Sequence, residues 1–127
     1  MQRDASIKIF LADDSALIRT RVAAMLATPQ LTVVGQAATA QDAIEGILAS
    51  KPDVVVMDVQ LEGGSGLDVM RLVGEIMPGL PFVVFTSHSE PVYRKRYLAA
   101  GAYRFLDKST EFDQLAGAIR DAAPALH

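Results

Sequence analysis

The segment KIFLADDSALI (Lys8–Ile18) begins as an apolar run, reaches two adjacent carboxylates, Asp13 and Asp14, and continues with apolar residues at helical spacing. Its first part, with the β-forming residues of 7–12, predicts a buried strand, and the spacing over 15–26 predicts a helix. Two like charges side by side at the junction of a strand and a helix are costly unless something compensates them. This junction therefore indicates both the fold class and a candidate site.

The same alternation of strand and helix continues along the chain. It predicts strands at 31–37, 53–58, 81–87 and 103–107, and helices at 39–50, 66–76, 90–102 and 109–123. Strands that alternate with helices form a parallel sheet with helices on both faces. The strands at 53–57 and 81–85 contain no polar residue and are expected at the centre, whereas 31–37 is expected at an edge. We therefore predict an α/β fold with a doubly wound five-stranded parallel sheet, strand order 2-1-3-4-5, and five helices.

Local signals set the expected ends of several elements. Glu90-Pro91 opens the helix at 90–102 and Gly101 closes it, which is the usual asymmetry of Pro and Gly at helix ends. An S/T-x-x-D pattern predicts that the last helix begins at Ser109. The glycine-rich segment EGGSG (62–66) is expected to be a loop.

Length and composition limit the class of protein. The chain has 127 residues, half of them hydrophobic, which suits one domain over 1–127. Its net charge of −3 argues against direct binding to nucleic acid, and the lack of cysteine excludes disulfides and thiolate metal sites. The N-terminal segment has no signal-peptide pattern, and no apolar run approaches the roughly 18 residues that cross a bilayer. We expect a cytoplasmic protein with no membrane partner.

Polar residues follow four of the predicted strands where each strand ends. They are Asp13 and Asp14, Asp58, Thr86 and Ser87, and Asp107 and Lys108. Sites in open parallel sheets form beyond these carboxyl ends, so we expect the side chains to converge. Each also has a simpler explanation: a helix cap at Asp14 or Ser15, a strand end, a β-forming threonine, a solvated lysine. The coincidence at four strand ends favours a site.

Three carboxylates at one rim need a counter-charge. Two charges about 4 Å apart repel by on the order of 4 kcal/mol at an effective dielectric near 20. One lysine cannot neutralise three acids, and oxygen ligands favour Mg²⁺, with Mn²⁺ as the alternative. With Asp13 and Asp14 holding a metal, the Asp58 carboxylate is free to act as a nucleophile toward a phosphoryl group.

These motifs resemble the receiver domain of bacterial two-component response regulators, including its stand-alone chemotaxis type. The matching features are the acidic pair after the first strand, "MD" ending the third with Gly66 eight residues after Asp58, "FTS" after the fourth, and "FLDK" at the fifth. The resemblance covers about residues 6–122 and implies the flavodoxin-like fold. It implies a phosphoacceptor signalling domain that catalyses only its own phosphorylation and autodephosphorylation.

The resemblance implies a role for individual residues around the metal and the phosphoryl group. Asp58 corresponds to the phosphoacceptor. Asp14 corresponds to a direct Mg²⁺ ligand and Asp13 to a ligand through water, with Asp58 and the backbone carbonyl of Gln60 completing the protein ligands. Lys108 corresponds to the residue that pairs with a phosphoryl oxygen.

Further roles concern switching and hydrolysis. Thr86 corresponds to the hydroxyl that phosphorylation draws toward the phosphoryl group, and Phe105 to the switch aromatic that fills the vacated space. Gln60 and His88 flank the path of the hydrolytic water, where we expect them to tune the phosphoryl lifetime. Ordinary core packing of Phe105 and a surface histidine at 88 are the simpler alternatives.

Two positions depart from the family pattern. Glu62 stands where the family often has proline, which is expected to loosen the loop. Ser109 stands where proline usually follows the lysine in a cis bond. A cis bond before a residue other than proline costs roughly 3 kcal/mol, so we predict a trans Lys108–Ser109 bond.

The resemblance also implies partners. A histidine kinase or histidine phosphotransfer protein is the donor, and Leu17, off the apolar stripe of its helix, is a candidate contact. The output is a changed surface around helix 90–101, strand 103–106 and the last helix, for a downstream protein, an effector domain or a homodimer through the 90–122 face. Part of this face is rich in basic and aromatic residues, and a solvated helix is its simpler explanation: Tyr93, Arg94, Lys95, Arg96, Tyr97, Tyr103 and Arg104.

Other functions fit the sequence less well. A phosphatase of the haloacid dehalogenase type has Asp-x-Asp at one strand end, whereas the acids here are adjacent and the nucleophile follows another strand. The glycines of 63–66 match neither G-x-G-x-x-G nor a P-loop. A receiver used only as an unphosphorylated interaction module remains an alternative.

Overall fold

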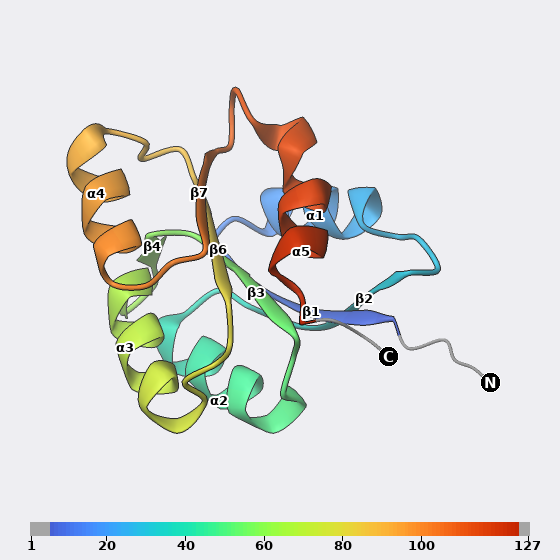
Figure 1. The fold of residues 1–127 in the computed structure, drawn as a ribbon, viewed down its shortest axis with the longest axis horizontal. Coiled ribbons are helices and arrows are strands. Elements are labelled where there is room, and N and C mark those ends of the chain that lie inside the picture. The colour runs from blue at the N-terminus through green and yellow to red at the C-terminus, as the bar shows by residue number, and fades with distance from the viewer. Residues whose placement is uncertain (1–5, 125–127) are drawn as a thin grey trace.

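The computed structural model describes residues 6–124 and contains a five-stranded parallel sheet in the order β2-β1-β3-β6-β7 (Figure 1). This order is the predicted 2-1-3-4-5, and β2 lies at an edge as expected. The strands are β1 (Ile7–Ala12), β2 (Leu31–Ala37), β3 (Val54–Met57), β6 (Phe82–Thr86) and β7 (Arg104–Asp107).

Helices cover both faces of the sheet (Figure 1). They are α1 (Ala16–Met25), α2 (Ala40–Ser50), α3 (Gly66–Ile76), α4 (Pro91–Ala99) and α5 (Leu115–Ala122). Buried residues of α1 and α5 share one apolar core, and those of α2, α3 and α4 share the other. Among the described residues, no helix has the length and apolar character needed to span a bilayer.

Strand β3 shows why the sheet lies between two cores. All four of its residues are buried. Val54 and Val56 face the core under α1 and α5, whereas Val55 and Met57 face the other core. Successive side chains of a strand point to opposite faces, so a strand that is apolar at every position must be covered on both sides.

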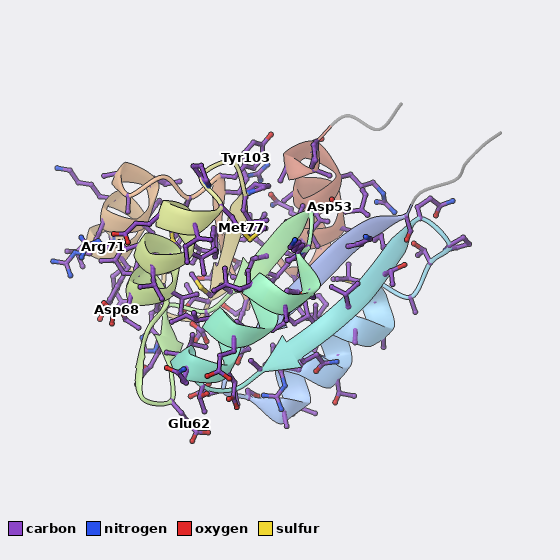
Figure 2. The ribbon with its side chains drawn as sticks, turned by 90° about the horizontal axis from the view of Figure 1, so that it is seen from below. Asp53, Glu62, Asp68, Arg71, Met77 and Tyr103 are labelled. Atoms are coloured by element: carbon purple, nitrogen blue, oxygen red, sulfur yellow. The ribbon has the colours of Figure 1, made fainter. Side chains whose placement is uncertain are left out.

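The glycine-rich segment after β3 is a hairpin rather than an open loop. Strand β4 (Gln60–Leu61) pairs antiparallel with β5 (Gly64–Ser65), and Gly63 turns the chain with a φ of 75°. The backbone of Glu62 donates to the carbonyl of Ala38 at 3.2 Å and accepts from Ala40 at 2.9 Å. Backbone bonds thus hold the hairpin, while the side chain of Glu62 points outward at its tip (Figure 2). The expected loosening at Glu62 stays a prediction.

The last helix begins later than predicted. A short 3₁₀ helix, η1 (Phe112–Gln114), precedes α5, and Ser109 does not cap it. The backbone N–H groups of Ser109 and Thr110 instead donate to Oδ1 of Asp107, at 2.7 and 3.2 Å. An aspartate side chain that accepts from the backbone two and three residues later forms a turn, which competes with helix initiation.

The ends of α4 agree with the sequence signals, although the helix is shorter than 90–102. Pro91 occupies its first turn, and Gly101, just after the end, has a φ of 110°. These two residues fix where the helix begins and ends, because proline lacks the N–H that the first turn does not need and glycine accepts positive φ.

Candidate functional site

The carboxyl ends of β1, β3, β6 and β7 bring the predicted polar residues to one edge of the sheet. Backbone bonds continue the strand ladder into this edge: Asp58 donates to Ala12 at 2.9 Å, and Lys108 donates to Thr86 at 2.9 Å. The side chains at the strand ends are therefore carried on a rigid backbone. The structure brings together Asp13, Asp14, Asp58, Thr86 and Lys108.

Asp13, Asp14 and Asp58 form an acidic cluster whose ligand oxygens all lie within 4.8 Å of one another. Asp13 and Asp58 are buried, whereas Asp14 is exposed. Ser15 caps α1 by accepting from Ile18 at 3.2 Å, so Asp14 is not used as the cap. The donors are all carboxylate oxygens, which is the set that Mg²⁺ and Mn²⁺ prefer.

Lys108 connects two members of this cluster. Its Nζ lies 2.7 Å from Oδ2 of Asp13 and 2.8 Å from Oδ2 of Asp58. Burial raises the pKa of the Asp13 carboxyl, although the hydrogen bond from Lys108 opposes this. Burial also acts to lower the pKa of Lys108, but its bonds to the two carboxylates outweigh burial and raise that pKa. The ammonium therefore stays protonated between two acids.

Thr86 is fully buried and already directed toward Asp58. Its hydroxyl donates to Oδ1 of Asp58 at 2.6 Å and accepts from the backbone of His88 at 3.0 Å. A buried hydroxyl needs a partner, and the Asp58 carboxylate provides one. Movement of Thr86 toward this site was expected only on phosphorylation; in the structure the contact is present.

Phe105 lies behind the site rather than in it. Its side chain is buried, and its ring is 6.3 Å from the ring of Tyr97, at an angle of 57°. The guanidinium of Arg94 lies over the Phe105 ring, 5.0 Å from its centroid, and donates to the Phe105 carbonyl at 3.1 Å. The switch aromatic that the sequence suggested is thus in an inward position.

Asp107 holds the turn that follows Lys108. No peptide bond in the described residues is cis, so the predicted trans Lys108–Ser109 bond is confirmed. The Ser109 N–H, which a proline would lack, donates to Asp107 at 2.7 Å. Hydroxyl donors from Ser109 and Ser89 keep the pKa of Asp107 well below its usual value. At the position where the family usually has proline, Ser109 therefore forms a turn by bonding to the side chain of Asp107.

Gly66 allows the chain to pass close to Asp58. A Cβ at this position would lie 2.5 Å from the Asp58 carbonyl oxygen, far inside van der Waals contact. The Gly66 N–H donates to the carbonyl of Val59 at 2.9 Å. The glycine eight residues after the acid is therefore needed because of a close backbone approach.

An open cleft of about 500 Å³ lies over the cluster. Asp14, Asp58 and Lys108 line it together with the exposed Gln60 and the half-buried His88. The Gln60 N–H lies 3.4 Å from Oδ1 of Asp58. Gln60 and His88 thus both line the cleft over Asp58.

Tyr97 is buried, although its place in the basic and aromatic segment 93–104 favoured an exposed position. Its side chain is 3% exposed, whereas Tyr103 of the same segment is 46% exposed. A helical signal was present: Tyr93 and Tyr97 are four residues apart and share one face of α4. The structuring role of Asp107 was also missed, because it depends on serines from two different loops.

Comparisons with known proteins agree with this geometry. The response regulator receiver domain model matches residues 9–120. The chain is 34% identical over 116 residues to the DNA-binding transcriptional activator DevR/DosR of Mycobacterium tuberculosis, covering 91% of this chain and 54% of that protein. It is 36% identical over 115 residues to the response regulator GacA of Pseudomonas aeruginosa, covering 90% of this chain and 54% of that protein. The chain thus spans about half the length of the curated relatives it matches.

Solved structures show the same fold. The signal receiver domain of NarL from Mycobacterium tuberculosis superposes with a TM-score of 0.86 at 28% identity, over 93% of this chain and 96% of that one. The response regulator domain of Thermotoga maritima CheB gives 0.83 at 26%, over 92% and 96%. The chain belongs to the response regulator receiver domain family, the phosphoacceptor signalling domains of two-component systems.

Proposed function

We propose that Asp58 is the residue that accepts the phosphoryl group. The observation that carries this is the contact of its carboxylate with both Lys108, at 2.8 Å, and Thr86, at 2.6 Å, inside the acidic cluster. A phosphoryl group on Asp58 presents new oxygens to the same ammonium and hydroxyl. The two groups are within reach of the reacting atoms before transfer begins.

The acidic cluster fits a divalent hard cation. Asp13, Asp14 and Asp58, with the backbone carbonyl of Gln60, are the proposed ligands of Mg²⁺, or of Mn²⁺ in its place. When bound, the metal neutralises charge on the carboxylates and on the transferring phosphoryl oxygens. Asp14, exposed and not needed as a helix cap, is the ligand most available to an ion arriving from solvent.

The proposed transfer is an in-line displacement at phosphorus. A carboxylate oxygen of Asp58 forms the new P–O bond, the P–N bond of a donor phosphohistidine breaks, and the imidazole nitrogen keeps the electron pair. Lys108 and Thr86 then bond to phosphoryl oxygens instead of to the free carboxylate. Water later attacks phosphorus and releases phosphate from Asp58, along a path that Gln60 and His88 flank.

The family supports a proposal for the donor and for the output. Response regulators receive phosphoryl groups from histidine kinases and act on downstream partners. We propose a histidine kinase or phosphotransfer protein as donor here, which implies a cytoplasmic location, and Leu17, 70% exposed beside the acidic pair, as a contact for it. The proposed output is the surface of α4, β7 and α5, read by a downstream protein, an effector domain or a second copy through 90–122.

Incubation with acetyl phosphate and Mg²⁺, followed by intact mass measurement, tests the proposal. We expect a gain of about 80 Da that disappears with EDTA and in Asp58→Asn. Asp53→Asn is the control, because its carboxylate lies outside the cluster and accepts from the Lys8 backbone. An unchanged mass in the folded wild type contradicts the proposal and favours an unphosphorylated interaction module. Steady turnover of a small phosphoester favours a phosphatase.

A further inference from the structure

Tyr97 is the only buried residue of α4, and its hydroxyl links this helix to the segment beside Asp58. The hydroxyl donates to the carbonyl of Val59 at 3.2 Å and accepts from the N–H of Leu67 at 3.1 Å. Burial raises the pKa of Tyr97, so the hydroxyl keeps its proton and can donate. Two backbone groups, 38 and 30 residues earlier in the chain, thus bond to one side chain.

Both partners of the hydroxyl lie close to the phosphorylation site. Val59 directly follows Asp58, and its carbonyl also accepts from Gly66 at 2.9 Å. Leu67 is in the first turn of α3, where the N–H groups have no acceptor within the helix. The hydroxyl of Tyr97 therefore joins the two ends of the segment that contains the β4–β5 hairpin.

Other attachments of α4 are few. Glu90 at its N-terminus makes no side-chain cap, and the remaining residues of the helix are exposed or half-buried. Arg94 contacts the carbonyl of Phe105 at 3.1 Å and the carboxylate of Glu111 at 3.6 Å. Arg94 thus fixes the helix to β7 and the turn after it, whereas Tyr97 fixes it to the segment between β3 and α3.

We propose that Tyr97 is a positioning residue that couples the backbone beside Asp58 to α4, in addition to the path through Thr86 and Phe105. The inference rests on the proposed phosphorylation of Asp58. A phosphoryl group on Asp58 would constrain the backbone that carries Val59, as would a metal held by the proposed ligands, which include the Gln60 carbonyl. A shift of the Val59 carbonyl moves Tyr97 or breaks its hydrogen bond, and a buried hydroxyl proton without an acceptor is unfavourable. The rings of Tyr97 and Phe105 are in contact, so the path through Tyr97 and the path through Thr86 and Phe105 meet at this pair of rings.

A phosphoryl analogue separates this coupling from simple packing. Amide NMR shifts of the labelled chain are recorded with Mg²⁺ before and after beryllofluoride is added. In the wild type we expect shifts at 58–61 and along α4. In Tyr97→Phe, which keeps the ring, we expect the shifts at 58–61 to remain and those along α4 to fall at least about twofold. The matched control is Tyr103→Phe, which removes an exposed hydroxyl bonded to Asp121 and keeps both responses.

The possible results distinguish failure of the coupling from failure of the proposed function. Unchanged α4 shifts in Tyr97→Phe overturn the coupling while leaving the proposed function intact. Absent shifts at 58–61 in the wild type overturn the proposed function, and the coupling with it. A second measurement needs no variant: the ring ¹³Cζ signal of Tyr97 in the wild type moves on addition of the analogue. A stationary Tyr97 signal overturns the coupling.

Discussion

The ammonium of Lys108 lies 2.8 Å from the carboxylate of Asp58, fifty residues earlier in the chain. The same nitrogen is 2.7 Å from Asp13, so one cation joins the ends of β7, β3 and β1. Among the described residues, Asp14 has no ion-pair partner. The site therefore combines an internal ion pair with one exposed carboxylate that is open to an incoming ion.

Lys108→Met removes the cation and keeps a chain of similar length. It leaves the buried carboxylates of Asp13 and Asp58 without the cation that lies between them, so we expect a loss of about 3 kcal/mol in the free energy of unfolding in metal-free buffer. Urea unfolding measures it. Lys95→Met, at an exposed position of α4, is the control and should change stability little. Equal losses in the two variants contradict the assignment of Lys108 as the internal counter-charge.

Asp14→Asn tests the proposed metal ligand. Loss of the exposed carboxylate should weaken Mn²⁺ binding, followed by electron paramagnetic resonance of the free ion, at least about tenfold. Stability without metal should change little, because Asp14 is exposed and does not cap α1. Asp121→Asn, at an exposed position of α5, is the control. Unaltered Mn²⁺ affinity in Asp14→Asn excludes that carboxylate as a ligand.

Gly66→Ala tests the close approach to Asp58. The added Cβ meets the Asp58 carbonyl at 2.5 Å, so the backbone must move. We expect a loss of about 2 kcal/mol and slower phosphorylation by acetyl phosphate. Gly74→Ala in the same helix has no atom within 4 Å of its new Cβ and should stabilise by about 0.5–1 kcal/mol. Similar effects of the two substitutions argue that Gly66 has no special backbone role.

The lowered pKa of Asp107 predicts how the stability of the fold changes at low pH. Its pKa is lower in the folded state than the ordinary value of 3.8, because the Ser109 and Ser89 hydroxyls bond to the ionised form. The stabilisation is therefore complete above pH 3.8 and is lost as pH falls through the folded-state pKa. In melting curves below pH 3.8, Asp107→Asn should lose less stability than the wild type. Parallel curves would show that this carboxylate is not specially bonded; Asp113→Asn is the exposed control.

The parts of the fold that follow from local patterns could be predicted from the sequence. The apolar runs at β3 and β6 predicted the central strands, because a strand buried on both faces is apolar at every position. The acidic residues at the strand ends predicted the cluster, because the carboxyl ends of parallel strands meet at one edge of the sheet. The hairpin at 60–65 could not be predicted, since backbone bonds with 38–40 hold it. Likewise the turn at Asp107 needs Ser89 from another loop. The spacing of Tyr93 and Tyr97 indicates a shared helix face, but the backbone partners of the Tyr97 hydroxyl lie in two other segments and could not be predicted.

Fragmentation of the intact phosphorylated chain in a mass spectrometer tests the central claim most directly, because it locates the modification on one residue. After treatment with acetyl phosphate and Mg²⁺, the added mass should be retained only in fragments that contain Asp58. Its appearance on Asp13, Asp14 or a hydroxyl side chain, with Asp58 unmodified, would contradict the account.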